Sequence, residues 1–190
     1  MRCHLCLELS WQPLCKTCLS TILTPTPSFR ILDCGLKVYS FYRYTDIAPL
    51  LHTKHTYIGA KIFTQLARHT FLEFLKMVDL PKGICAIPID DHVRHGYSHS
   101  AILAKATQPY LMPLYGALRA KNETSYSGKS KAYRQAHKRD FIFTCKNKID
   151  AVFIDDIVTT GTTLEEAHEV LKKHGINVLF ALVLADAKEY

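Results

Sequence analysis

The sequence predicts an α/β fold: a mostly parallel β-sheet covered by helices on both faces, with a small cysteine-rich module in front. Short, continuous apolar segments at 83–89 and 176–184 have the length and composition of buried strands. Apolar residues at 46–77 recur instead at helical spacing. Strands that alternate with helices favour a parallel sheet. Four of the seven cysteines lie before residue 19, apart from these segments.

The chain divides into two predicted domains, a cysteine module with its linker at 1–28 and the α/β domain at 29–190. The linker is rich in Pro, Thr and Ser, which end regular structure. After it, residues 29–33 and 37–44 are rich in aromatic and branched side chains and predict two strands of a hairpin across the Cys34–Gly35 turn.

The middle of the chain predicts helices, two strands and a loop. Residues 46–77 predict helix, 83–89 a buried strand, and 98–106 a second helix that begins near its serine. Residues 110–115 predict another strand. Residues 119–140 have many charges and no clear period, and they predict a mobile loop with a helical piece at its C-terminal end.

The C-terminal part predicts one strand–helix–strand unit. A strand is expected at 149–156, and a helix starts at Thr162 or Thr163. Gly175 is expected to end that helix as the C′ residue, before a last strand at 176–184.

Composition and charge limit the class of protein. The chain has 190 residues, 48% of them hydrophobic, which suits a globular domain with a real core. Its longest apolar run near the C-terminus, 178–185, is too short to span a bilayer, and the N-terminus shows no apolar signal core. We therefore expect a cytoplasmic protein without an integral membrane segment.

The positive charge is local. The formal net charge is +7, while residues 91–148 alone carry 11 Lys/Arg against 3 Asp/Glu. Because local basic surfaces attract polyanions, this segment indicates a polyanionic partner.

The cysteine module has the spacing C-x2-C-x8-C-x2-C, which is typical of a structural zinc site. The alternatives are disulfides or four unrelated cysteines, and His4 could compete as a ligand. Four sulfur ligands leave no open position, so the predicted Zn²⁺ is structural rather than catalytic. The predicted ligands are Cys3, Cys6, Cys15 and Cys18.

The stretch VFIDDIVTTGTT at 152–163 joins a predicted strand to a predicted helix. Asp155 and Asp156 come where parallel α/β sheets bind ligands, at the carboxyl end of a strand. The Thr/Gly turn after them offers hydroxyls and backbone N–H groups for an anion. Two adjacent carboxylates and an anion cradle suit a phosphorylated sugar. The alternative is a helix-capping Asp before an ordinary polar turn, which accounts for one Asp but not for both.

This stretch resembles the phosphoribosyl pyrophosphate (PRPP) loop of type I phosphoribosyltransferases. The resemblance implies that Asp155 and Asp156 bind the ribose hydroxyls and that the turn binds the 5′-phosphate, with Mg²⁺ accompanying the pyrophosphate. The turn residues are Thr159, Thr160, Gly161, Thr162 and Thr163.

With the cysteine pairs in front, the chain resembles the ComF competence family (ComFC- and GntX-like proteins) over nearly its whole length. Further matching segments are 53–59, 87–99 and 133–143. The resemblance implies that Lys54 lies near pyrophosphate and that Arg94 belongs to a loop that closes over the site.

Two segments differ from the family pattern. Residues 95–99 read HGYSH where the family often has R-G-F-N-Q, and 134–137 read RQAH where it often has R-x-x-N. The histidines of 92–99 also suggest a second metal site, although no carboxylate stands in register with them in the sequence.

The basic segment 118–143 interleaves cations with aromatic residues. Cations neutralise phosphates and aromatic faces stack unpaired bases, so the pattern favours single-stranded DNA. The alternative is a solvated loop, with Phe141 and Phe143 alternating as strand core residues. The predicted DNA-binding residues are Lys121, Lys129, Lys131, Tyr133, Arg134, Lys138 and Arg139.

Three functions follow as hypotheses. The family resemblance implies a natural-transformation protein that binds single-stranded DNA and PRPP and assists DNA transport across the inner membrane into the cytoplasm. Its expected partners are a helicase-like DNA translocase and other competence proteins, which would bring it to the inner membrane peripherally. The second hypothesis is an active phosphoribosyltransferase of nucleotide metabolism, for which the sequence identifies no acceptor pocket or catalytic residue. The third is an assembly adaptor.

Overall fold

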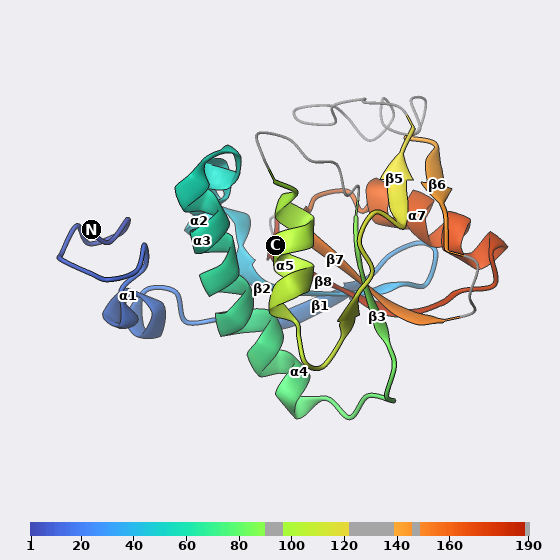
Figure 1. The fold of residues 1–190 in the computed structure, drawn as a ribbon, viewed down its shortest axis with the longest axis horizontal. Helices are drawn as coiled ribbons and strands as arrows, with labels where there is room; N and C mark the ends of the chain where they lie inside the picture. Colours follow the sequence, from blue (N-terminus) through green and yellow to red (C-terminus); the bar gives the residue numbers. More distant parts are fainter. Residues whose placement is uncertain (90–96, 122–138, 146–148, 189–190) are drawn as a thin grey trace.

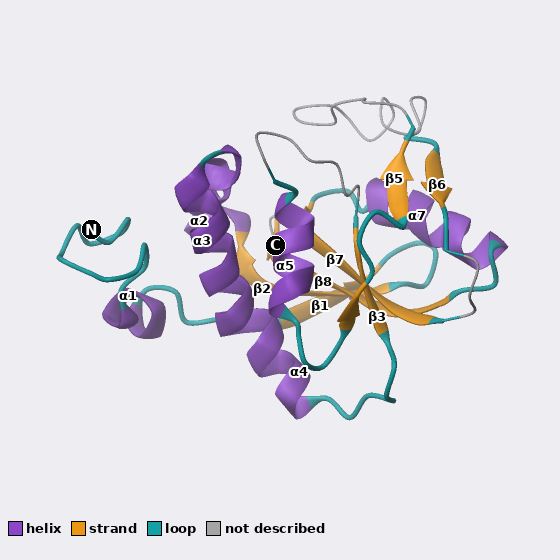
Figure 2. Cartoon of the chain, viewed as in Figure 1, coloured by secondary structure: helices purple, strands orange, loops and turns teal. Residues whose placement is uncertain are grey.

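A computed structural model describes residues 1–89, 97–121, 139–145 and 149–188. Its centre is a six-stranded sheet with helices on both faces (Figures 1 and 2). The strands are parallel except the edge strand β1, which is antiparallel to β2. The predicted α/β class is thereby confirmed. In spatial order the strands are β1 (Ser28–Ile31), β2 (Lys37–Arg43), β8 (Asn177–Asp186), β7 (Asp150–Val158), β3 (Cys85–Pro88) and β4 (Met112–Pro113).

The cysteine module stands at one end of the molecule and contains the short helix α1 (Lys16–Thr21) (Figure 1). It is joined to the rest by its apolar side chains, because Leu14 and Leu23 are 1% exposed and belong to the main core cluster. Gln65 also accepts a hydrogen bond from the Leu14 N–H at 3.0 Å and donates one to the Leu14 carbonyl at 2.9 Å. The domain boundary at residue 28 stays a prediction.

One face of the sheet is covered by the helices that follow β2 (Figure 2). The predicted helical region 46–77 is helical but not continuous. A 3₁₀ turn breaks it at His52–His55, and Thr56 starts a new helix by accepting a hydrogen bond from the Gly59 N–H at 3.0 Å. The helices on this face are α2 (Tyr44–Leu51), α3 (Tyr57–Ala67), a π-helical turn (Arg68–Leu72), α4 (Glu73–Met77) and α5 (His99–Ala106).

The other face is covered by helix α7 (Thr162–Lys173) and by a small hairpin of β5 (Leu118–Ala120) and β6 (Phe141–Phe143) (Figure 1). The start of the predicted loop is therefore strand, because 118–120 pairs with 141–143. Phe141 and Phe143 are buried and Ile142 is exposed, which confirms the alternation expected of strand core residues.

Strand β7 is longer than predicted and continues to Val158. Beyond Ile154 its ladder runs on with β8, where Asp155 pairs with Val183 and Val158 with Asp186. On the opposite side, the pairing of β3 with β7 ends at Pro88, opposite Ile154. Among the described residues, the part of β7 that carries the two carboxylates is thus paired with β8 on one side and with no strand on the other.

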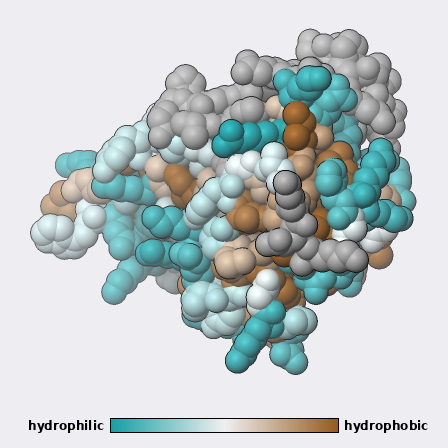
Figure 3. All heavy atoms as spheres, turned by 45° about the vertical axis from the view of Figure 1, so that its right-hand side comes forward, coloured by the Kyte–Doolittle hydropathy of each residue, from teal (hydrophilic) through white to brown (hydrophobic). Residues whose placement is uncertain are grey.

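On the face shown in Figure 3, apolar residues gather in the middle and hydrophilic residues surround them. Trp11 of the cysteine module is 100% exposed and Leu9 is 83% exposed. Among the described residues, every helix is too short or too polar to cross a bilayer.

Candidate sugar-phosphate site

The acidic pair is fixed by the backbone of β7. Asp156 is buried, at 4% exposed, while Asp155 is half-buried. The Asp156 N–H donates to the Asp155 carboxylate at 2.8 Å, so one oxygen of Asp155 already has a partner. Neighbouring carboxylates in a strand would repel unless positive groups or a ligand compensated them.

Two cationic or ionisable side chains from the helical face reach Asp156. The Lys54 Nζ lies 3.1 Å and the His99 Nε2 3.8 Å from the Asp156 Oδ2. Lys54 belongs to the 3₁₀ turn before α3, and His99 is the first residue of α5. The structure therefore brings Lys54 to the acidic pair and adds His99, one of the histidines of 92–99, which was not predicted to belong to the sugar-phosphate site.

These neighbours shift the pKa values of the two carboxyl groups in opposite directions. Burial raises the pKa of Asp155 well above the ordinary value of an aspartate, and the charge of Asp156 raises it further. Burial acts on Asp156 in the same direction, but the charges of His99 and Lys54 outweigh it and lower the pKa of Asp156. Burial alone would lower the pKa of Lys54, but the charge of Asp156 and its hydrogen bond raise the pKa overall. Asp156 is thus held as an anion, and a further positive group beside the pair would mainly stabilise the ionised form of Asp155.

The turn after β7 has the geometry of an anion cradle. Gly161 adopts a positive φ of 87° and precedes α7, whose first helical hydrogen bond runs from the Glu165 N–H to the Gly161 carbonyl at 3.0 Å. The hydroxyls of Thr160 and Thr162 lie 3.0 Å apart. The N-cap residue Gly161 has no side chain to cap α7, and the Thr162 N–H makes only a long contact of 3.5 Å with the Thr160 hydroxyl. An anion could replace this contact at the N-terminus of the helix.

The strand β1 and the turn after it support this cradle, a role that sequence reasoning missed. The Arg30 guanidinium donates to the Thr159 carbonyl, and its Nε lies 3.3 Å from the Asp186 Oδ2. Glu165 accepts a hydrogen bond from the Asp33 N–H at 3.2 Å. A Cβ on Gly161 would lie 2.5 Å from a methyl carbon of Leu32, so Leu32 packs directly against the cradle.

Tyr97 fixes the turn that carries Lys54. Its hydroxyl lies within hydrogen-bond distance of the carbonyls of Lys54 and Thr56, the latter at 3.0 Å, and shares its single proton between them. Burial raises the pKa of this hydroxyl. Arg94, predicted to lie in the loop that closes over the site, is outside the described residues.

The four predicted metal ligands come together in the cysteine module. The sulfur atoms of Cys3, Cys6, Cys15 and Cys18 all lie within 4.8 Å of one another, and within the described residues no cysteine forms a disulfide. The sulfurs of Cys6 and Cys15 are 3.7 Å apart. Sulfurs bound tetrahedrally at about 2.3 Å from a zinc ion would be about 3.8 Å apart.

The backbone of the module favours a thiolate at Cys3, whereas burial raises the pKa of Cys18. The Cys15 N–H donates to the Cys3 sulfur at 3.3 Å, and the Cys18 N–H donates to the Cys15 sulfur at 3.4 Å. Burial would raise the pKa of Cys3, but such backbone hydrogen bonds lower it to about 6. The cluster can therefore hold a metal ion, and its residues fit a structural zinc.

The predicted DNA-binding residues lie partly in the described structure. Lys121 follows β5 and is exposed, and its N–H donates to the Asp140 carbonyl at 3.1 Å. The Arg139 N–H donates to the Glu166 carboxylate of α7 at 3.0 Å, and the charge of Arg139 acts on Asp155. The other five predicted residues lie outside the described residues, namely Lys129, Lys131, Tyr133, Arg134 and Lys138.

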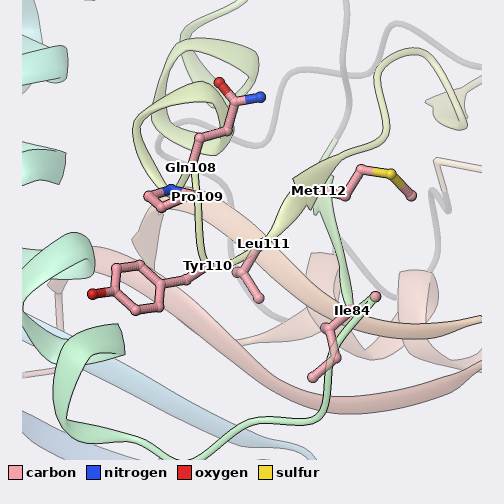
Figure 4. Close-up of a pocket in the computed structure, with 7 residues that line it drawn as sticks. Ile84, Gln108, Pro109, Tyr110, Leu111 and Met112 are labelled. Atoms are coloured by element: carbon pink, nitrogen blue, oxygen red, sulfur yellow. The ribbon is translucent and has the colours of Figure 1, made fainter.

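A cavity of about 400 Å³ lies elsewhere, between the segment before β3 and the segment that joins α5 to β4 (Figure 4). Its lining includes Ile84, Tyr110, Leu111 and Met112. It is at the amino end of β3 and β4, whereas the acidic pair lies toward the carboxyl end of β7. Because these strands are parallel, the cavity and the acidic pair lie toward opposite ends of the strands.

Solved structures that are similar to this chain include the following three. The UMP synthase of Leishmania donovani has a TM-score of 0.42 and 17% identity over 90% of this chain, which spans 30% of that protein. An adenine phosphoribosyltransferase has a TM-score of 0.41 and 14% identity over 84% of each chain. The orotate phosphoribosyltransferase of Aeropyrum pernix has a TM-score of 0.39 and 22% identity over 90% of this chain and 80% of its own. The similarity concerns the fold alone.

Comparisons of the sequence give no further relative. No protein-family model matches the chain. No curated protein matches it significantly.

Proposed function

We propose that this protein binds a ribose 5-phosphate group, such as that of PRPP, in the loop from Asp155 to Thr163. The observation that carries the proposal is the direct succession of two carboxylates, a positive-φ glycine and a helix N-terminus. A ribose presents two neighbouring hydroxyls that donate to carboxylates. The N–H groups of α7 supply the complementary site for its phosphate.

Lys54 is proposed to change partners when such a ligand binds. In the described structure its ammonium compensates Asp156. PRPP brings a pyrophosphate next to the ribose, and Lys54 would turn to it while the sugar hydroxyls take over the carboxylate. Arg94 would add a second cation from the closing loop, and Mg²⁺ would accompany the pyrophosphate.

For the biological role we propose DNA uptake in natural transformation, which is what the resemblance to the ComF competence family implies. The protein would bind incoming single-stranded DNA and act in the cytoplasm, at the inner membrane only through partners such as a helicase-like translocase. Support for a DNA surface comes from the net charge of residues 119–148, which hold 9 Lys/Arg and 2 Asp/Glu. The cysteine module would carry a structural Zn²⁺.

The test is a calorimetric titration of ribose 5-phosphate, PRPP with Mg²⁺, and a short single-stranded DNA into the full chain. Wild type is compared with Asp155→Asn/Asp156→Asn. The matched control is Asp46→Asn/Asp79→Asn, which removes the same charge from two exposed positions. We expect both sugar phosphates to bind wild type and the control but not the variant of the acidic pair. Equal binding of ribose 5-phosphate by all three proteins would refute the proposed site.

The same samples distinguish the related hypotheses. Loss of DNA binding in the acidic-pair variant would mean that one pocket serves DNA and sugar phosphate, whereas unchanged DNA binding would place DNA elsewhere. Release of pyrophosphate from PRPP in the presence of a panel of bases would replace the binding role by an active phosphoribosyltransferase.

The basic segment has its own test. Lys129→Glu/Lys131→Glu/Arg134→Glu should weaken DNA binding and reduce the slope of log K against log salt by about 2, because each phosphate contact contributes about 0.7 for single strands. An unchanged slope would exclude these residues from the DNA surface.

A further inference from the structure

The acidic pair has a third potential metal ligand beside it, the imidazole of His99. One ligand atom each of His99, Asp155 and Asp156 lies within 4.8 Å of the other two. The three residues come from two elements, since Asp155 and Asp156 belong to β7 and His99 opens α5. The sequence suggests a metal site at the histidines of 92–99 but gives no carboxylate for it, because the nearer acid of the pair, Asp155, is 56 positions away from His99.

The distances suit a small divalent cation. With bonds of about 2.1 Å, the ligand atoms of one ion lie about 3.0 Å apart in neighbouring octahedral positions and about 4.2 Å apart in opposite ones. The His99 Nε2 and the Asp156 Oδ2 are 3.8 Å apart, between these values. One ion bonded to both atoms at about 2.1 Å therefore fits this separation.

The position is partly accessible and already attracts a cation. The side chain of His99 is 28% exposed, and that of Asp156 is 6% exposed. The ammonium of Lys54 lies against the same oxygen of Asp156, at 3.1 Å. Lys54 is itself 32% exposed at its side chain, so it can leave for solvent.

We propose that His99, Asp155 and Asp156 form a binding site for a first-row divalent transition metal, which the protein takes up without any sugar phosphate by displacing Lys54. An imidazole beside two carboxylates favours such a metal over Mg²⁺, which prefers oxygen ligands only. Water would complete the coordination. Lys54 is the internal competitor that keeps the affinity moderate.

The inference shares the acidic pair with the proposed function but does not rest on it. Metal uptake is measured in the absence of any sugar phosphate, and ribose 5-phosphate binding is measured in the absence of metal. Either result can fail while the other holds.

Mn²⁺ is the probe, because its free form gives an electron paramagnetic resonance signal that disappears on binding. The full chain is first loaded with Zn²⁺, so that the four cysteines are occupied. We expect wild type to remove one equivalent of Mn²⁺ from solution and an equal concentration of Mg²⁺ to displace little of it. His99→Ala should weaken Mn²⁺ binding at least about tenfold, because loss of even an outer-shell partner of a metal typically costs about 10–100-fold in affinity. The control His174→Ala removes an exposed imidazole at the end of α7 and should bind like wild type.

Lys54→Met provides a test with the opposite sign. Removal of the competing ammonium should tighten Mn²⁺ binding several-fold, whereas removal of a mere structural residue would leave it equal or weaker. In wild type, Mn²⁺ should also broaden the proton resonances of the His99 ring, which are identified by their loss in His99→Ala. No uptake of Mn²⁺ by wild type, unchanged affinity in His99→Ala, or equal displacement by Mg²⁺ would each overturn the proposal.

Discussion

Substitution of Gly161 by alanine should damage the phosphate cradle for two separable reasons. The φ of Gly161 is 87°, a conformation that costs a residue with a Cβ about 1–2 kcal/mol. The added Cβ would also lie 2.5 Å and 3.1 Å from the two methyl carbons of Leu32. Leu32 is 7% exposed, so relief requires core atoms to move, at a cost of about 1–3 kcal/mol. We expect Gly161→Ala to lower the free energy of unfolding by about 2–5 kcal/mol.

Gly83→Ala is the matched control, because Gly83 has a φ of 85° and no atom within 4 Å of its added Cβ. Urea unfolding of both variants should show Gly161→Ala to be less stable than Gly83→Ala by the steric part alone, about 1–3 kcal/mol. Ribose 5-phosphate binding should fall in Gly161→Ala and persist in Gly83→Ala.

A double substitution checks the cause. Placing Gly161→Ala on a Leu32→Ala background should cost about 1–2 kcal/mol, because only the backbone conformation remains to be strained. Equal stability of Gly161→Ala and wild type, or an equal cost of Gly161→Ala with and without Leu32, would refute the reasoning from the Leu32 contact.

Three further predictions concern the metal, the acidic pair and the attachment of the cysteine module. Elemental analysis should find one zinc per chain in wild type and in Cys34→Ala but none in Cys18→Ala; zinc retained in the last variant would exclude the four-sulfur site. The raised pKa of Asp155 means that the folded protein favours its protonated form, so its charge lowers stability as pH rises above the ordinary aspartate range. Asp155→Asn should therefore be more stable than wild type at pH 7 and show a smaller difference near pH 4 in urea unfolding, and a variant less stable at pH 7 would contradict the assigned shift. Gln65→Ala removes both hydrogen bonds to Leu14 and should speed protease cleavage within 20–28, and unchanged cleavage would show that apolar packing alone holds the module.

Local signals in the sequence were sufficient where one short stretch contains the whole feature. The acidic pair, the glycine of the turn and the start of α7 follow one another within nine residues, and the structure has them as expected. Ser98 caps α5 by accepting from the Ala101 N–H at 3.1 Å, as the predicted helix start requires. The four cysteines also approach as their spacing predicts.

Contacts between distant segments could not be predicted in this way. Arg30 reaches Thr159 across 129 positions, and Lys54 reaches Asp156 across 102. Periodicity and spacing describe near neighbours, whereas these pairings depend on the order of strands in the sheet. The same limit applies to His99, because the carboxylates beside it, Asp155 and Asp156, come from β7.

The helical region 46–77 is interrupted for a local reason that the spacing of its apolar residues does not reveal. Thr56 has an extended backbone with a ψ of 154°, and its side chain starts a new helix. The apolar residues on both sides of this break still face one core, so their spacing reads as helix throughout. The extra residues of β7 likewise depend on a partner, since β8 supplies the ladder beyond Ile154.

Helix α3 connects two parts of the molecule that look independent in the sequence. Gln65, near its C-terminal end, is bound to the cysteine module, and the turn before its N-terminal end carries Lys54. An 11-residue helix is a stiff rod of about 16 Å. A displacement of the module that is transmitted through Gln65 would therefore reach the turn that carries the ammonium beside Asp156. The cysteine module and the acidic pair thus share α3 as a common support.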